Sequence, residues 1–101
     1  MVSEYDAGDQ LLRMADGVLE QFSASIAGSL RIPVAWLAVE LNPGKHDVVQ
    51  VQVGRAADRS ASIYSKIAFT NPNFSFEIPV AEEPRLRAFL DQAASAANRS
   101  A

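Results

Sequence analysis

The sequence predicts a small, mostly β domain closed by one C-terminal helix. Through most of the chain apolar residues recur at every second position, as they do in strands with one buried face, and the period becomes helical near the C-terminus. Within residues 31–44 the apolar phase switches faces just after Pro33, a residue that cannot donate to a sheet ladder. We therefore expect two strands, about 29–34 and 36–41, that meet at a bend, with Trp36 buried at the corner.

The region before the bend predicts a hairpin. Residues 1–9 are polar and acidic, so we expect them to form a flexible N-terminus. Asp16 and Gly17 suit the positive φ angles of a tight turn. Apolar residues alternate with other residues on both sides of this turn: Leu12, Met14, Phe22, Ala24 and Ile26. We expect these alternating residues to point into the core.

Three further strands are expected after the bend, over residues 48–53, 62–69 and 74–80. Their alternating apolar residues form the predicted core together with Trp36 and the helix: Val49, Val51, Val53, Ile63, Ile67, Phe69, Phe74, Phe76 and Ile78. The strand count becomes seven.

A helix is predicted over about residues 83–97. Pro84 suits a first helical turn, and the acids Glu82 and Glu83 suit the positive end of the helix dipole. One apolar stripe follows at helical spacing: Leu86, Phe89, Leu90, Ala93 and Ala97. Residues 98–101 lack anchoring side chains, and we expect a flexible tail.

Composition limits the classes of protein. The 101 residues fit one domain, here residues 10–97, and the absence of cysteine removes disulfides and thiol chemistry. The net charge of −3, without clustered basic residues, argues against nucleic acid as a partner and disfavours contact with an anionic membrane. No leader peptide or spanning run is evident, so we expect a cytoplasmic protein, and the excess of arginine over lysine suggests a bacterial source.

The order of these elements resembles small bacterial pleckstrin-homology-like (PH-like) domains. The resemblance rests on three stretches: LRIPVAWLAVEL after a glycine turn, the pair VVQVQV and SIYSKIAF, and NFSFEIPVAEEPRLRAFLDQA. It covers residues 10–97 and implies a seven-stranded barrel of two near-orthogonal antiparallel sheets, with the C-terminal helix capping one open end.

No catalytic or metal-binding pattern is present. His46 stands alone in a turn, and no serine lies in a nucleophile motif. We expect no enzymatic activity, no cofactor and no metal.

In the phosphotyrosine-binding branch of the resembled superfamily, a peptide adds as an extra strand between the fifth strand and the C-terminal helix. We expect the corresponding strand to be residues 48–53, an uncharged β-prone run that a peptide or a second copy of the chain could cover. Gln50, Gln52 and Arg55 are the candidate partner-binding residues. Arg55 and Arg59 are also a candidate anion site, although Asp58 lies between them.

Two alternatives to a protein-binding or scaffold module stay open. A small-ligand carrier or cryptic enzyme would use a cavity under Trp36. A peripheral module for anionic lipids would need its basic residues to converge on one surface: Lys45, Arg55, Arg59 and Lys66.

Overall fold

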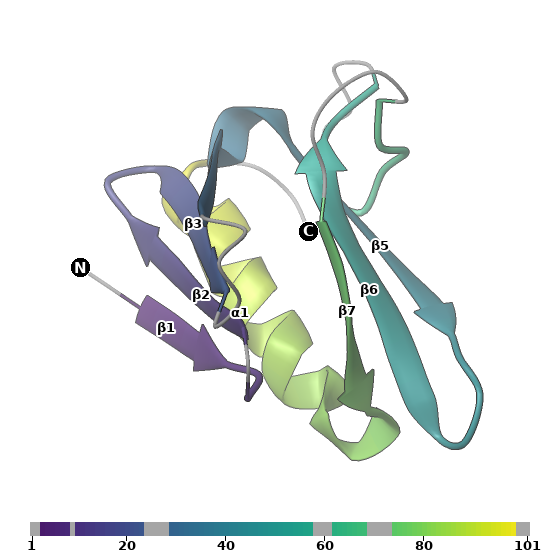
Figure 1. The fold of residues 1–101 in the computed structure, drawn as a ribbon. Helices are drawn as coiled ribbons and strands as arrows, with labels where there is room; N and C mark the ends of the chain where they lie inside the picture. The colour runs from purple at the N-terminus through teal and green to yellow at the C-terminus, as the bar shows by residue number, and fades with distance from the viewer. Residues whose placement is uncertain (1–2, 9, 24–28, 58–61, 69–73, 99–101) are drawn as a thin grey trace.

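The computed structural model describes residues 3–8, 10–23, 29–57, 62–68 and 74–98, which form two antiparallel sheets and one C-terminal helix (Figure 1). The first sheet has the order β1-β2-β3-β4, with bounds Ser3–Asp6, Gln10–Ala15, Val18–Ser23 and Ser29–Pro33. The second has the order β5-β6-β7, with bounds Leu37–Pro43, Val48–Arg55 and Phe74–Pro79. Two short 3₁₀ turns, η1 (Val34–Trp36) and η2 (Val80–Glu82), precede β5 and helix α1 (Glu83–Ala96). The predicted mostly β architecture with a terminal helix is confirmed.

The predicted bend is also confirmed, but the position of Trp36 is not. Pro33 ends β4, η1 carries the chain across, and β5 continues in the second sheet. A 3₁₀ helix has three residues per turn, so Val34 and Leu37 lie on the same side, and both are buried. Trp36 is turned outward and is 38% exposed, with the Arg55 guanidinium 4.8 Å from its ring centroid. The expectation that Trp36 fills the core was wrong.

The predicted hairpin at Asp16 and Gly17 is confirmed, with φ angles of 52° and 76°. In the strand that follows, however, the inward phase is the opposite of the prediction. Leu19 and Gln21 point into the core, whereas Phe22 points outward and is 36% exposed. The polar group of Gln21 can be buried because its side-chain amide donates a hydrogen bond to the Gln10 side-chain oxygen. Ala24 and Ile26 lie outside the described residues.

The N-terminal segment differs from the predicted flexible terminus. Residues 3–6 form β1 and pair with β2, and Tyr5 is only 1% exposed. Its ring lies 6.1 Å from that of Phe89, and the Arg85 guanidinium lies 4.2 Å from its centroid on the other side. A single apolar residue among acids gives no periodic signal, although one large aromatic side chain is enough to anchor a short strand. The tail residues 99–101 lie outside the described ranges.

Residues 62–68 do not form the predicted strand. They bridge only locally, at Ala56 with Ile67, while the buried Ile63 places its carbonyl against the outer edge of β5. Strand β6 pairs directly with β7, so these residues do not take the expected place between the two in the sheet. The last residue of the predicted strand, Phe69, lies outside the described residues.

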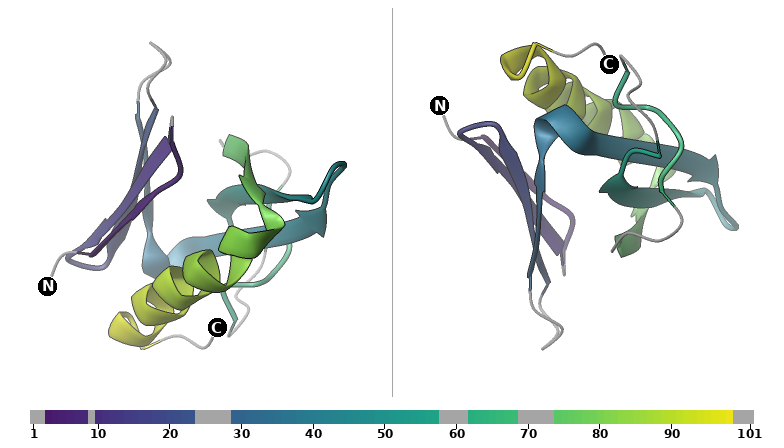
Figure 2. Two further views of the ribbon diagram at one scale, coloured as in Figure 1. Left: turned by 90° about the horizontal axis from the view of Figure 1, so that it is seen from below. Right: turned by 90° about the horizontal axis from the view of Figure 1, so that it is seen from above.

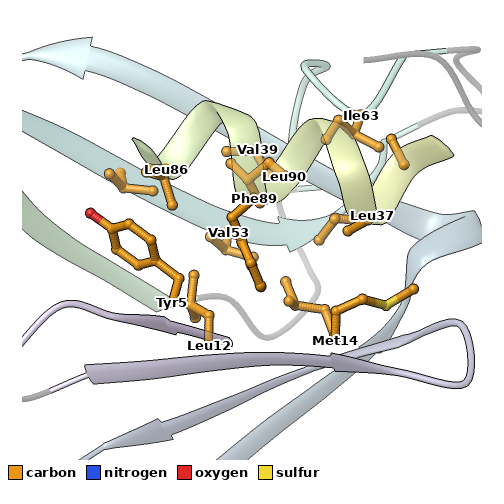
Figure 3. Close-up of a cluster of buried hydrophobic side chains, with 14 of the residues drawn as sticks. Tyr5, Leu12, Met14, Leu37, Val39, Val53, Ile63, Leu86, Phe89 and Leu90 are labelled. Atoms are coloured by element: carbon orange, nitrogen blue, oxygen red, sulfur yellow. The ribbon is translucent and has the colours of Figure 1, made fainter. Parts of the chain in front are cut away.

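Helix α1 crosses the opening between the two sheets and packs on both (Figures 1 and 2). Four of the five predicted stripe residues are buried, and Ala94 is buried with them: Leu86, Phe89, Leu90, Ala93 and Ala94. The fifth, Ala97, lies just beyond the end of the helix and is only partly buried. In the core these side chains meet Tyr5 and Leu12 from the first sheet and Val39 and Val53 from the second (Figure 3). Burying a leucine of this kind contributes about 1.5–3 kcal/mol, so the helix contributes strongly to holding the sheets together.

The rest of the predicted core is partly confirmed. Four of the strand residues are fully buried with Ile63: Val49, Val51, Val53 and Ile78. Ile67, Phe74 and Phe76 are only half-buried. The two phenylalanines lie on the core face of β7, an edge strand of the second sheet, where fewer neighbours surround them.

Candidate functional site: the groove beside strand β5

Strand β6 is the centre of the second sheet, and this corrects the predicted site of strand addition. Residues 49–55 pair with β5 on one side, and residues 48–53 pair with β7 on the other. Their backbone donors and acceptors are therefore already used, and no peptide can add along residues 48–53. The expectation of an exposed strand there was wrong, because alternation shows which side chains are buried and does not show which strands are neighbours.

The open edge of this sheet that faces the helix belongs to β5. Two backbone hydrogen bonds lie at the ends of the β5–β6 pairing: Gly44 N–H donates to Val48 O at 2.9 Å, and Ala56 N–H donates to Trp36 O at 2.7 Å. Their positions show that the even-numbered residues of β5 form backbone hydrogen bonds with β6. The odd-numbered residues therefore direct their backbone groups outward. Pro43, the last of them, has no N–H to offer.

The chain itself occupies the first part of the β5 edge. Val39 N–H donates to Ile63 O at 2.7 Å, so one residue of the 62–68 segment already acts as an added strand. At Leu41, two residues further on, no backbone group of the described chain pairs on the outer side. The edge is therefore open at the outward backbone groups of Leu41.

A groove runs along this edge. One part has a volume of about 530 Å³, and the next part has about 280 Å³. Leu41 and Asn42 line both parts, so the two are adjacent. The first part is lined by Val39, Glu40, Leu41, Asn42, Tyr64, Ser65, Lys66 and Arg87. The second is lined by Leu41, Asn42, Pro43, Gly44, Asp47, Val48, Val49, Val80 and Glu83.

The wall opposite β5 comes from η2 and α1. Val80, Glu83 and Arg87 follow one another at helical spacing, three and four residues apart, and so line the groove in sequence. Val80 is 51% exposed, the largest value among the exposed large apolar residues of the described chain. Arg87 Nε lies 2.9 Å from Glu83 Oε2. The wall thus offers an apolar contact beside an ion pair.

Tyr64 fixes the 62–68 segment to the helix. Its hydroxyl donates to Asp91 Oδ1 at 2.8 Å, and the Arg87 guanidinium lies 5.2 Å from its ring centroid. Burial, and then the hydrogen bond to the Asp91 carboxylate, raise the pKa of Tyr64 above its ordinary value. The phenol therefore stays protonated and keeps donating at neutral pH.

Three polar groups of the groove differ in how they are satisfied. Glu40 Oε2 accepts a hydrogen bond from Ile67 N–H at 3.3 Å. Ser65 Oγ is inaccessible to solvent and has no hydrogen-bond partner within the described residues. Lys66 is exposed and forms no ion pair with any described acid. Lys66 is thus available to a bound molecule, whereas Ser65 Oγ is shielded from one.

The predicted contact residues lie elsewhere. Gln50 and Gln52 are exposed on the outer face of β6, where a shallow depression of about 500 Å³ is lined by both of them with Ser75, Phe76 and Glu77. Arg55 lies at the end of β6 against Trp36. Its predicted partner in an anion site, Arg59, lies outside the described residues.

Two of the basic residues of the lipid alternative, Lys45 and Arg55, lie far apart. Lys45 lies in the turn between β5 and β6, whereas Arg55 is at the far end of the same hairpin. At about 3.3 Å per residue, the eight residues of β6 separate them by more than about 20 Å. Trp36 lines none of the three hollows described here, so the proposed cavity beneath it has no support from them.

His46 is exposed in the β5–β6 turn, with φ 58°. Within the described ranges, no three His, Cys, Asp or Glu side chains cluster as metal ligands would. No helix in the described part of the chain has the length and apolar character needed to cross a membrane.

Sequence reasoning missed the groove because it depends on which strand lies at the edge. Pro43 carried one usable signal, since proline in a strand favours an edge position. Nothing local in the sequence indicates that Tyr64 and Arg87 meet across the end of this edge. No protein-family model matches the chain, and no curated protein or solved structure shows significant similarity to it.

Proposed function

We propose that the chain is a peptide-binding module of PH-like fold, in which an extended segment of a partner protein adds to the outer edge of β5. The observation that carries the proposal is the unpaired outer side of Leu41 at the floor of a groove walled by α1. An open edge of this kind is completed by main-chain hydrogen bonds from another strand. The 62–68 segment already forms one such bond, at Val39.

The PH-like barrel is part of the same proposal. The order of two sequential sheets followed by a helix across their opening supports it. In that fold the fifth strand and the C-terminal helix enclose the peptide, and here the corresponding elements are β5 and α1 rather than residues 48–53.

The charges of the groove favour one direction of the bound segment. Lys66 lies at the end near Tyr64, and Asp47 lies at the end near Val80. We expect a ligand with an acidic side chain facing Lys66 and an apolar side chain against Val80. A basic residue would follow beside Asp47.

Selection from a display library of random dodecapeptides, followed by NMR mapping of the best binder, tests this proposal. We expect the largest amide shift changes at residues 39–42 and 80–87, together with new hydrogen-exchange protection of the Leu41 amide. A library that yields no binder contradicts the proposal, and so does a binder that maps to the face carrying Gln50 and Gln52.

A matched pair of variants separates groove contact from general charge effects. Val80→Asp and Gln52→Asp each add one acid at an exposed position of the second half of the chain. We expect Val80→Asp to weaken binding about tenfold through the lost apolar contact, and Gln52→Asp to leave it unchanged. Equal effects of the two variants would place the peptide outside the groove.

A further inference from the structure

The outer face of the first sheet has an ordered arrangement of charge. The register places the outward side chains of β1–β4 in rows that cross the strands. The middle row alternates in sign from one strand to the next: Glu4, Arg13, Glu20 and Arg31. Apolar side chains flank this row on both sides: Leu11, Phe22, Ala15, Val18 and Pro33. Asp6 lies at the β1 end of the row that holds Leu11 and Phe22. The face is thus neutral in its centre row and mainly apolar beside it.

No described element covers this face. Helix α1 and the second sheet both lie on the opposite side of β1–β4 (Figure 2). Phe22, on the outer side, is one of the few large apolar residues that stay exposed. Large exposed apolar side chains beside ordered charges are typical of interaction surfaces.

The charged row is incompletely paired within one chain. Arg31 Nε lies 3.4 Å from Glu20 Oε2. Arg13 lies between Glu4 and Glu20, yet its Nε is inaccessible to solvent and has no hydrogen-bond partner among the described residues. Arg13 forms no ion pair with either acid, so a further carboxylate close to its guanidinium would supply the opposite charge that it lacks.

We infer that this face binds a second copy of the chain, face to face, about a two-fold axis parallel to the strands. This axis reverses the strand order, so β1 lies on β4 of the copy and β2 lies on β3. Glu4 then meets Arg31 of the copy, and Arg13 meets Glu20 of the copy, so all four residues face opposite charges. Each apolar row meets the same row of the copy. An isologous interface requires a self-complementary pattern, and the alternating row provides one.

The charges also exclude the other face-to-face arrangement. An axis along the row would place every charged residue on its own equivalent, with Glu4 against Glu4 and Arg31 against Arg31. Packed sheets rotate by about 30° relative to each other, and the row is about 14 Å long. The inner pairs, Arg13 with Glu20, therefore stay opposite, and the outer pairs shift by a few ångströms, within reach of Arg and Glu side chains.

The size of the face sets the strength of the dimer. Four strands of four to six residues give a face of at most roughly 19 by 20 Å. This is small for a specific interface, so we expect a reversible dimer that dissociates on dilution. Because its centre row is charged, association should weaken as salt increases.

Complementary charge reversals test the inference by sedimentation equilibrium of the full chain. Arg13→Glu and Glu20→Arg each place like charges opposite one another at both inner pairs of a homodimer. We expect each variant alone to associate at least about a hundredfold more weakly than the wild type at low salt. An equimolar mixture restores opposite charges at every position, and it should recover the dimer. Lys66→Glu, a reversal of the same size in the β5 groove, should dimerise like the wild type.

Three results would overturn the inference: a wild-type chain that stays monomeric up to about 1 mM at low salt, a dimer unaffected by both reversals, or a mixture that associates no better than its components. If a reversal prevents folding, Phe22→Lys gives an independent variant, since this exposed side chain can change without disturbing the core. The inference does not rest on the proposed peptide groove, and loss of the dimer should leave peptide binding intact.

Discussion

The two sheets share one core but present different chemistry to solvent. The outer face of β1–β4 combines alternating charges with apolar rows that include Phe22. The outer face of β5–β7 carries mainly polar side chains over its exposed part: Glu40, Asn42, Gln50, Gln52, Ser75 and Glu77. The first sheet thus offers a face for association, whereas the second offers an edge, at β5. The difference shows that alternation alone, which is similar in both sheets, does not identify a binding surface.

The comparison assumes that the two sheets are one cooperative unit, and Leu90→Ala tests this with the largest expected effect. Leu90 is fully buried on α1, where the two sheets meet. We expect a loss of about 2–5 kcal/mol in the free energy of unfolding, measured by urea denaturation. Far-UV circular dichroism and Trp36 fluorescence should report one shared transition.

Val80→Ala is the control, because Val80 is largely exposed and its truncation should cost less than about 0.5 kcal/mol. Separate transitions for the two probes would show that the sheets unfold independently.

Replacing the Leu41 amide with an ester, by use of α-hydroxy-leucine, tests whether a bound peptide pairs with the β5 edge. This change removes the outward N–H and keeps the side chain, so the groove keeps its shape. We expect the affinity for a selected peptide to fall by about three- to tenfold, the usual net value of one hydrogen bond. Isothermal titration measures the affinity, and a thermal melt confirms folding. Unchanged affinity would mean that the peptide does not pair with β5.

The contact between the 62–68 segment and the helix predicts a pH dependence. Burial and Asp91 raise the pKa of Tyr64 in the folded chain. A phenol whose folded pKa exceeds the unfolded value of about 10 contributes stability that is complete below that pH and is lost as the pH rises beyond it. We expect the free energy of unfolding to fall as the pH rises above about 10, and to fall less in Tyr64→Phe.

Tyr5, whose pKa burial also raises, should account for the decrease that remains in Tyr64→Phe. Urea denaturation at each pH gives the comparison. An identical pH dependence in both proteins would show that Tyr64 ionises alike in the folded and unfolded chain.

The smallest effect is expected on the outer face of the second sheet. Gln52→Lys changes an exposed side chain that lies opposite Glu40 on the outer face of the sheet. Stability should change by less than about 0.5 kcal/mol, and neither peptide affinity nor dimerisation should change. A clear loss of either interaction would assign function to this face after all.

The sequence predicted the structure correctly where local residues alone determine it. Pro33 and the change of apolar phase predicted the passage from β4 to β5, and the Leu86–Leu90 spacing predicted the buried face of α1. The alternation of Val49, Val51 and Val53 correctly predicted the inward side of β6.

The prediction errors arose where contacts between residues distant in sequence determine burial, side-chain direction or strand order. Tyr5 is buried by Phe89 and Arg85, which lie at the other end of the sequence. The local pattern around Tyr5 therefore did not predict β1. Gln21 could point inward only because Gln10 accepts its amide, and this displaced Phe22 to the outside. The candidate site moved from β6 to β5 for a similar reason, because strand order is a property of the whole sheet.

The contact between Tyr5 of β1 and Phe89 of α1 has a consequence for the order of folding. Within each sheet every strand pairs with its neighbour in sequence, so the sheets form from contacts between nearby parts of the chain. The longest connection within a sheet is that of residues 56–73 between β6 and β7. The contact of Tyr5 with Phe89 instead joins the two ends of the chain. Closing so large a loop is the slow entropic step. We therefore expect the contact between β1 and α1 to form last. Tyr5→Ala should then speed unfolding and leave the folding rate nearly unchanged.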